Sequence, residues 1–160
     1  MRQIIGFHNP DEAYGFLSNW YLSDFVINDI KYTSMEQYMM YQKAMLFGDE
    51  EIASQIMSTT NVGKIKALGR SVSNYNESVW NGMRQVLIYK GLVEKFRQNE
   101  NLLKELQKTG DAILAECAVQ DRIWGIGLSM TDPAKNNMDL WNGQNLLGFA
   151  LMIVRSEVCS

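Results

Sequence analysis

Histidine, cysteine and proline are scarce in this sequence, and their scarcity excludes several kinds of active site. The 160 residues contain a single histidine, His8, and two cysteines, Cys117 and Cys159, which lack the spacing of metal ligands or of a disulfide framework. A zinc site of ordinary composition and a Ser-His-Asp triad are therefore not expected. Only 2 residues are proline, which is typical of a compact globular chain.

An excess of positive charge and a long apolar run are also missing. The chain has 15 Lys and Arg residues against 18 Asp and Glu residues. It therefore lacks the excess of basic residues that is typical of a protein that binds nucleic acid by itself. Its N-terminus lacks the basic residues followed by an apolar stretch that mark a secretory signal peptide. No apolar run approaches the roughly eighteen residues of a membrane span. With 46% apolar residues, we expect one domain over residues 1–160, located in the cytoplasm.

Hydrophobic periodicity, caps and turns predict several helices and a few short strands. The turn-forming pair Asn28-Asp29 predicts a hairpin over residues 24–33. Gly69 is expected to end one helix as a left-handed residue. The longest helix has an apolar stripe, most of which we expect to lie in the core: Trp80, Met83, Val86, Leu87, Leu92 and Phe96. The other predicted strands cover residues 2–7 and 112–117, and the predicted helices cover 34–45, 49–57, 61–68, 77–98, 101–108 and 146–156.

The helix from Ser34 to Met45 carries a combination of residues that suggests chemistry. Ser34 and Gln37 have the spacing of a capping box at its start. Glu36 and Lys43 are almost two turns apart, so they project from nearly the same face about 10 Å apart. That spacing is too long for a direct ion pair within the helix. Each charged group therefore has either a separate structural partner or a function, and the sequence leaves both open.

Two loops combine polar and aromatic residues, and each has a structural and a functional interpretation. Ser18 and Asn19 lie between aromatic residues, which either cover the core or hold a planar ligand, and covering the core is the simpler interpretation. Asp121 precedes Trp124 by three residues in a glycine-containing loop. Here the simpler interpretation is a turn or cap for the acid and a core position for the indole. A cluster of basic residues, Lys64, Lys66 and Arg70, forms either a solvated face or a contact with a phosphate.

Short motifs occur along the chain in a defined order, and the ordered set is much more specific than any one of them. They are Phe16-Leu17-Ser18-Asn19-Trp20, Ser34-Met35-Glu36-Gln37-Tyr38, Gln42-Lys43-Ala44, Lys66-Ala67-Leu68-Gly69-Arg70, Thr109-Gly110-Asp111, Asp121-Arg122-Ile123-Trp124-Gly125 and Gly143-Gln144-Asn145-Leu146-Leu147-Gly148. In this order the chain resembles the NADAR family, the YbiA-like group of N-glycosidases formerly described as a domain of unknown function. The resemblance covers residues 3–157.

The resemblance implies a single, mostly helical α+β domain that hydrolyses N-glycosidic bonds. Some members of the family release the base from early phosphorylated riboflavin intermediates, and others remove ADP-ribose from guanine in nucleic acid. The implied substrate is a small ribosyl phosphate, an ADP-ribose-type molecule, or ADP-ribosylated DNA or RNA. No cofactor, metal or membrane is implied. The alternative is a non-catalytic module that binds ADP-ribose or NAD derivatives.

The resemblance also assigns roles to residues of this chain. It implies that Glu36, Lys43 and Asp121 are catalytic, with Lys43 capturing C1 of the ribose as an imine while a carboxylic acid moves protons. Trp20 stands where many relatives have Phe or Tyr, and Gln37 where many have His, so any role of that histidine is absent here. The residues implied to bind substrate are Ser18, Asn19, Trp20, Arg70, Trp80, Arg122, Trp124 and Asn145.

Overall fold

The computed structural model describes residues 2–159, and the chain divides into two compact units. The first unit joins the N-terminal segment up to Tyr21 with the residues from Glu100 onward, and the second unit is Leu22–Asn99. Each unit contains helices and one pair of short strands, so the predicted α+β, mostly helical fold is confirmed. The single domain over residues 1–160 stays a prediction.

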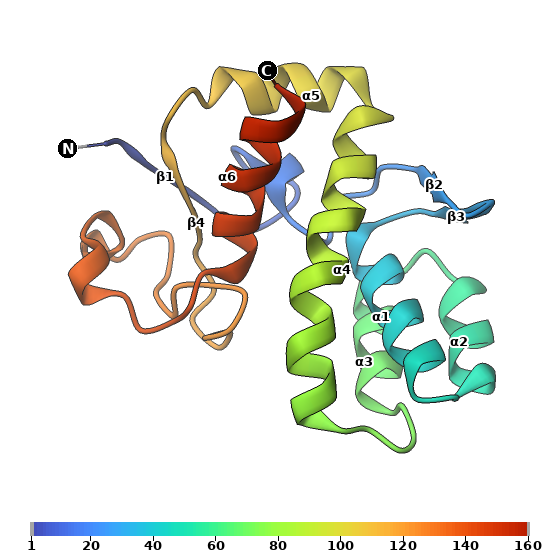
Figure 1. Cartoon of the computed structure of the whole chain (residues 1–160). Coiled ribbons are helices and arrows are strands. Elements are labelled where there is room, and N and C mark those ends of the chain that lie inside the picture. Colours follow the sequence, from blue (N-terminus) through green and yellow to red (C-terminus); the bar gives the residue numbers. More distant parts are fainter. Residues whose placement is uncertain (1, 160) are drawn as a thin grey trace. The chain divides into compact units, whose positions relative to one another are not determined.

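The first unit is built on a parallel pair of strands. Strand β1 (Ile4–Phe7) lies beside β4 (Ile113–Glu116), with Ile4 opposite Ile113. Helix α6 (Leu146–Val158) packs along β4, and α5 (Glu100–Lys108) contacts α6 (Figure 1). The sequence predicted these elements to within a few residues. It did not predict three short 3₁₀ helices, η1 (Gly15–Leu17), η2 (Pro133–Asn136) and η3 (Met138–Leu140).

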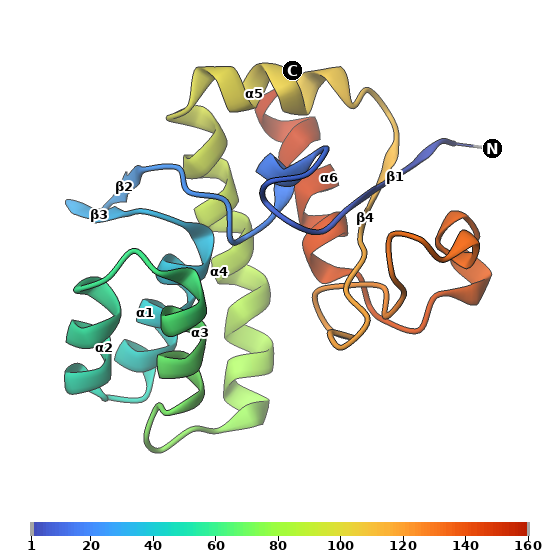
Figure 2. The same cartoon turned by 180° about the vertical axis from the view of Figure 1, so that it is seen from behind.

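The second unit is a group of helices with a hairpin. Its elements are β2 (Phe25–Ile27), β3 (Ile30–Tyr32), α1 (Met35–Leu46), α2 (Glu50–Met57), α3 (Val62–Arg70) and α4 (Glu77–Arg97). Helix α1 packs against α2, α3 and α4, and the hairpin strand β2 packs on α4 (Figure 2). The hairpin turn is the predicted one, since Asn28 and Asp29 have left-handed φ values of 52° and 65°.

The start of α1 differs in one detail from the predicted capping box. Ser34 Oγ accepts a hydrogen bond from the backbone N–H of Gln37 at 3.0 Å, as expected of an N-cap. The Gln37 side chain does not return to the N–H of the cap. Its Oε1 accepts from the N–H of Thr33 at 2.8 Å, and its Nε2 donates to two carbonyl groups near the end of α2. The glutamine therefore ties the start of α1 to the end of α2.

Gly69 does not end its helix, which corrects the sequence prediction. Helix α3 continues through Gly69 to Arg70, and Gly69 is not among the residues with positive φ. A Cβ at this position would lie 2.1 Å from Sδ of Met40 on α1. The side chain of Met40 therefore occupies the space that a Cβ would take, a tertiary contact between α3 and α1 that a helix-end pattern does not reveal.

Most of the apolar stripe of α4 lies in the core, as expected. Four of its members are buried, namely Trp80, Leu87, Leu92 and Phe96. The other two, Met83 and Val86, are 40% and 66% exposed. The buried face of the helix also includes two charged residues, Arg84 and Lys95.

Candidate active site

Lys43 lies in the last turn of α1, half-buried, in an environment that favours its neutral form. Burial lowers the pKa of Lys43 below its ordinary value, while the carboxylate of Glu36 acts in the opposite direction and raises it. The guanidinium groups of Arg70 and Arg84 repel the ammonium and lower the pKa further. The net shift is downward, so more of the amine is in the nucleophilic form at a given pH.

Three helices bring these charged groups together. Glu36 is in the first turn of α1, Arg70 is the last residue of α3, and Arg84 is in the middle of α4. Because α1 packs against both α3 and α4, the charges act on one lysine. The sequence predicted Glu36, Lys43 and Arg70 for this group and missed Arg84.

A signal for Arg84 was present in the sequence. It follows Trp80 by four residues and precedes Ile88 by four, so it falls on the buried face of α4 and is only 8% exposed. A charged residue inside an apolar stripe is rarely buried without a partner or a role. Trp80 itself is buried in the first turn of the same helix, and its assignment to substrate binding stays a prediction.

Asp121 shapes its own loop in the first unit. One carboxylate oxygen of Asp121 accepts hydrogen bonds from the backbone N–H groups of Ile123, at 3.0 Å, and Trp124, at 2.8 Å. The carbonyl groups of the same two residues accept from the N–H groups of Leu146 and Leu147. The loop therefore caps the start of α6, whose first N–H groups have no partner within the helix. Asp121 therefore has the structural role in a turn that its sequence position suggested, and its catalytic role stays a prediction.

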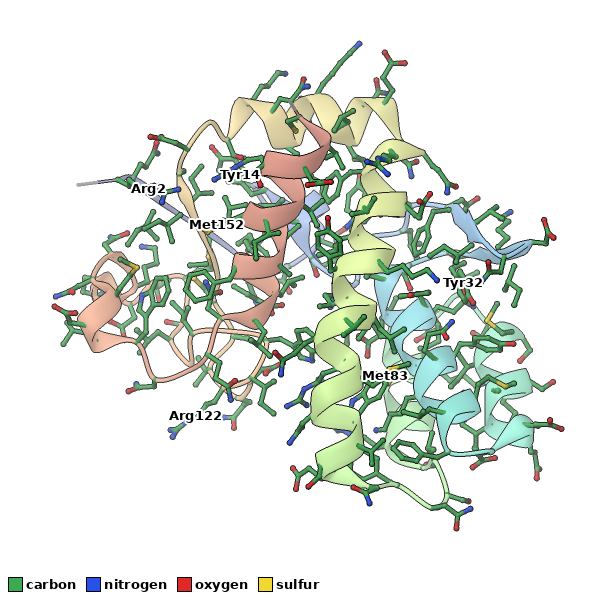
Figure 3. All side chains as sticks on the ribbon, viewed as in Figure 1. Arg2, Tyr14, Tyr32, Met83, Arg122 and Met152 are labelled. Carbon is green, nitrogen blue, oxygen red and sulfur yellow. The ribbon has the colours of Figure 1, made fainter. Side chains whose placement is uncertain are left out.

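Asn145 joins the strand and the helix of the first unit. It has a left-handed φ of 52°, and its buried amide donates to the carbonyl of Leu114 at 2.8 Å. Its side-chain oxygen accepts from the N–H of Glu116 at 3.0 Å. These bonds account structurally for the burial of this asparagine, and its predicted contact with substrate is untested. Arg122, by contrast, extends from its loop and is exposed (Figure 3).

Asn19 follows η1 and holds a buried acceptor. Ser18 before it accepts a hydrogen bond at its Oγ from the N–H of Trp20, at 3.1 Å. Asn19 is 8% exposed, and its side-chain oxygen has no hydrogen-bond partner in the described part of the chain. Leaving a buried acceptor unpaired costs about 1–3 kcal/mol. A hydrogen-bond donor on a ligand would remove that cost, which supports the predicted substrate-binding role of Asn19.

Residues 2–159 lack two kinds of feature. No group of three or more His, Cys, Asp or Glu residues there has the arrangement of a metal site. None of the helices there combines the length and apolar character needed to cross a membrane. Cys117 and Cys159 are free thiols.

Known proteins that resemble the chain belong to a class of enzymes. The NMR structure of the Escherichia coli protein YbiA is similar, with a TM-score of 0.81 and 26% identity, over 99% of this chain and 86% of that one. An N-glycosidase of Acanthamoeba polyphaga mimivirus is 42% identical over 127 residues, covering 79% of this chain and 75% of that protein. The class is that of N-glycosyl hydrolases, as the resemblance implied.

The family follows from a match to its domain model. The NADAR domain model matches residues 6–159, and the chain belongs to the NADAR family. A riboflavin biosynthesis protein of Vibrio vulnificus is 30% identical over 158 residues. The match takes in 99% of this chain but only 39% of the Vibrio protein.

Proposed function

We propose that this chain hydrolyses the N-glycosidic bond of a phosphorylated ribosyl substrate, with Lys43 as the nucleophile. The observation that carries the proposal is the half-buried amine of Lys43, whose pKa is lowered by burial and by two guanidinium groups. An amine attacks carbon only when it is neutral, so a lowered pKa is what a nucleophilic lysine requires. The guanidinium groups of Arg70 and Arg84 also provide charge that attracts a phosphate.

The proposed reaction consumes one water and needs no oxidant or reductant. The Lys43 amine attacks C1 of the ribose, and the bond between C1 and the base nitrogen breaks. Glu36 or Asp121 acts as the general acid and gives a proton to the departing base. The ribose ring then opens, its ring oxygen takes the proton that the attacking nitrogen loses, and an imine forms. Water adds to the imine, returns a proton to the carboxylate, and releases the sugar phosphate from Lys43.

Other residues are proposed to hold the substrate. Trp80 and Trp124 offer indole surfaces for stacking on a base or for excluding water. Arg122 and Lys64 are further candidates for the phosphate, beside Arg70. The unpaired side-chain oxygen of Asn19 accepts a hydrogen bond from a base or sugar.

The substrate proposed first is an early phosphorylated intermediate of riboflavin synthesis. The name of the Vibrio relative, a riboflavin biosynthesis protein, supports it, because that protein is similar over nearly all of this chain. ADP-ribose attached to guanine in DNA or RNA presents the same kind of bond, from ribose C1 to a base nitrogen, next to a phosphate. Both substrates therefore belong in one experiment.

The test is to incubate the protein with each substrate and to identify the released base by mass spectrometry. Lys43→Ala is the matched variant, with circular dichroism to show that the helical fold is retained. We expect release of base from one substrate by the natural chain and loss of turnover in the variant. Turnover by Lys43→Ala close to the natural rate would show that Lys43 is not the nucleophile. Tight binding of ADP-ribose without release from either substrate would favour the non-catalytic module instead.

A further inference from the structure

The loop between α3 and α4, residues 71–76, is attached to Asp49 at the start of α2. One carboxylate oxygen of Asp49 caps α2 by accepting from the N–H of Ile52 at 3.1 Å, and the other accepts from the N–H of Ser73 at 2.9 Å. The next residue, Asn74, has a left-handed φ of 59°, a conformation that asparagine adopts more readily than most residues. The loop is thereby held against the corner between α1 and α2.

Tyr75 is placed by this loop under the side chain of Lys43. Its ring and the ring of Phe47 pack edge to face, with 5.5 Å between ring centroids and an angle of 71° between planes. Nζ of Lys43 lies over the same ring, 4.5 Å from its centroid. This is within the distance of about 6 Å at which a ring attracts a cation. Tyr75 is 44% exposed, so filling the core does not account for its position.

We propose that Tyr75 is a positioning residue, which holds the ammonium of Lys43 on the face of its ring and releases the amine when the proton leaves. The π face of a ring attracts a cation, whereas a neutral amine loses that attraction. Loss of the proton therefore makes the nitrogen nucleophilic and frees it in the same step. The inference rests on the proposed function only in taking the freed amine as the attacking group.

Four groups act on the charge of Lys43, and Tyr75 is the one that can be changed without changing a charge. Glu36 on α1 and the ring of Tyr75 favour the ammonium. Arg70 on α3 and Arg84 on α4 favour the amine, as does burial. Substituting Glu36 or an arginine alters the net charge near the substrate, so its effect on Lys43 cannot be separated from its effect on binding.

The first experiment measures the protonation of Lys43 without any substrate. Competitive acetylation across a pH series, followed by peptide mass spectrometry, gives the titration of each lysine, with the exposed Lys104 as an internal control. In Tyr75→Leu the apolar cover stays and the π face is lost. We expect the pKa of Lys43 to fall by about half a unit, roughly a threefold change in the ratio of amine to ammonium. In Tyr75→Phe the face is kept, and the natural titration should return.

An unchanged titration of Lys43 in Tyr75→Leu would overturn the inference. Equal shifts in Tyr75→Leu and Tyr75→Phe would also overturn it, because they would assign the effect to the Tyr75 hydroxyl and not to the ring. The second experiment follows kcat/KM with pH, and the acidic limb of Tyr75→Leu should move by the same half unit. If the titration shifts and the acidic limb does not, Tyr75 holds Lys43 but Lys43 is not the nucleophile. The inference and the proposed function therefore fail on different measurements.

Discussion

Glu36 has two separable effects at the scale of single residues. Its carboxylate raises the pKa of Lys43 against the effect of burial, and it is one of the two acids proposed to protonate the departing base. The first effect acts on the fraction of neutral amine, and the second acts on the rate after the amine has formed. A single substitution that removes the charge therefore changes both the pH profile and the plateau.

For Glu36→Gln we expect the acidic limb of the rate profile to move to lower pH, because the group that raised the pKa of Lys43 is gone. The plateau kcat should fall by about 10²–10⁴-fold if Glu36 is the general acid, with KM changed little. Steady-state kinetics across pH measure both. The matched variant is Asp121→Asn, which should show the large loss instead if Asp121 is the acid. A rise in KM at constant kcat would assign Glu36 to binding.

At the scale of elements, the caps and turns were the predictable part of the fold. Ser34, Asp49 and Asn61 each accept a hydrogen bond from an N–H in the first turn of α1, α2 and α3, and Ser34 was predicted to do so. These contacts are local, so a few neighbouring residues specify them. Gly69 was interpreted wrongly because its reason is Met40, a residue on another helix. Packing between helices leaves no comparable local pattern.

Two glycines of α4 test this distinction, because they share a helix and differ in their surroundings. A Cβ at Gly91 would lie 2.6 Å from Cε1 of the buried Tyr38 ring and 2.8 Å from Cε of Met35. At Gly82 nothing lies within 4 Å. We expect Gly91→Ala to lower the free energy of unfolding by about 1–3 kcal/mol through overpacking. Gly82→Ala should raise it by up to about 1 kcal/mol through helix propensity.

Urea denaturation followed by circular dichroism measures both variants against the natural chain. Equal effects of the two substitutions would show that helix propensity alone decides, and that the contact between α1 and α4 is looser than the structure has it.

At the scale of the whole molecule, a fully buried lysine links stability to pH. Lys95 on α4 is 0% exposed, and burial lowers its pKa from 10.5 to about 7. Between these two values the unfolded chain binds a proton at this residue and the folded protein does not. The free energy of unfolding therefore rises with pH across this range and becomes insensitive to Lys95 below it.

The natural chain should accordingly be more stable to urea at pH 9 than at pH 7. Lys95→Met keeps the length of the side chain without a titrating group, and we expect most of the difference to disappear. A smaller rise should remain, because the pKa of Lys43 is lowered in the same sense. Midpoints for the natural chain that do not differ between the two pH values would contradict this account.

The site was predictable to the extent that its chemistry appears in short patterns. Glu36 and Lys43 were candidate site residues because they are charged residues on a largely apolar helix, and the ordered motifs identified the family. Tyr75 carried no such signal, because it stands in an irregular loop whose position depends on Asp49 and Phe47. Contacts of this kind arise only when separate helices pack, so no short pattern in the sequence reveals them.

Reduction with borohydride during turnover tests the central claim most directly. An imine between Lys43 and the sugar would be reduced to a stable secondary amine, and peptide mass spectrometry would locate it. We predict a ribosyl phosphate adduct on Lys43 that requires substrate, appears on no other lysine, and is absent from Lys43→Ala. Continued release of base with no adduct on Lys43 would contradict the account and leave hydrolysis by carboxylic acids alone.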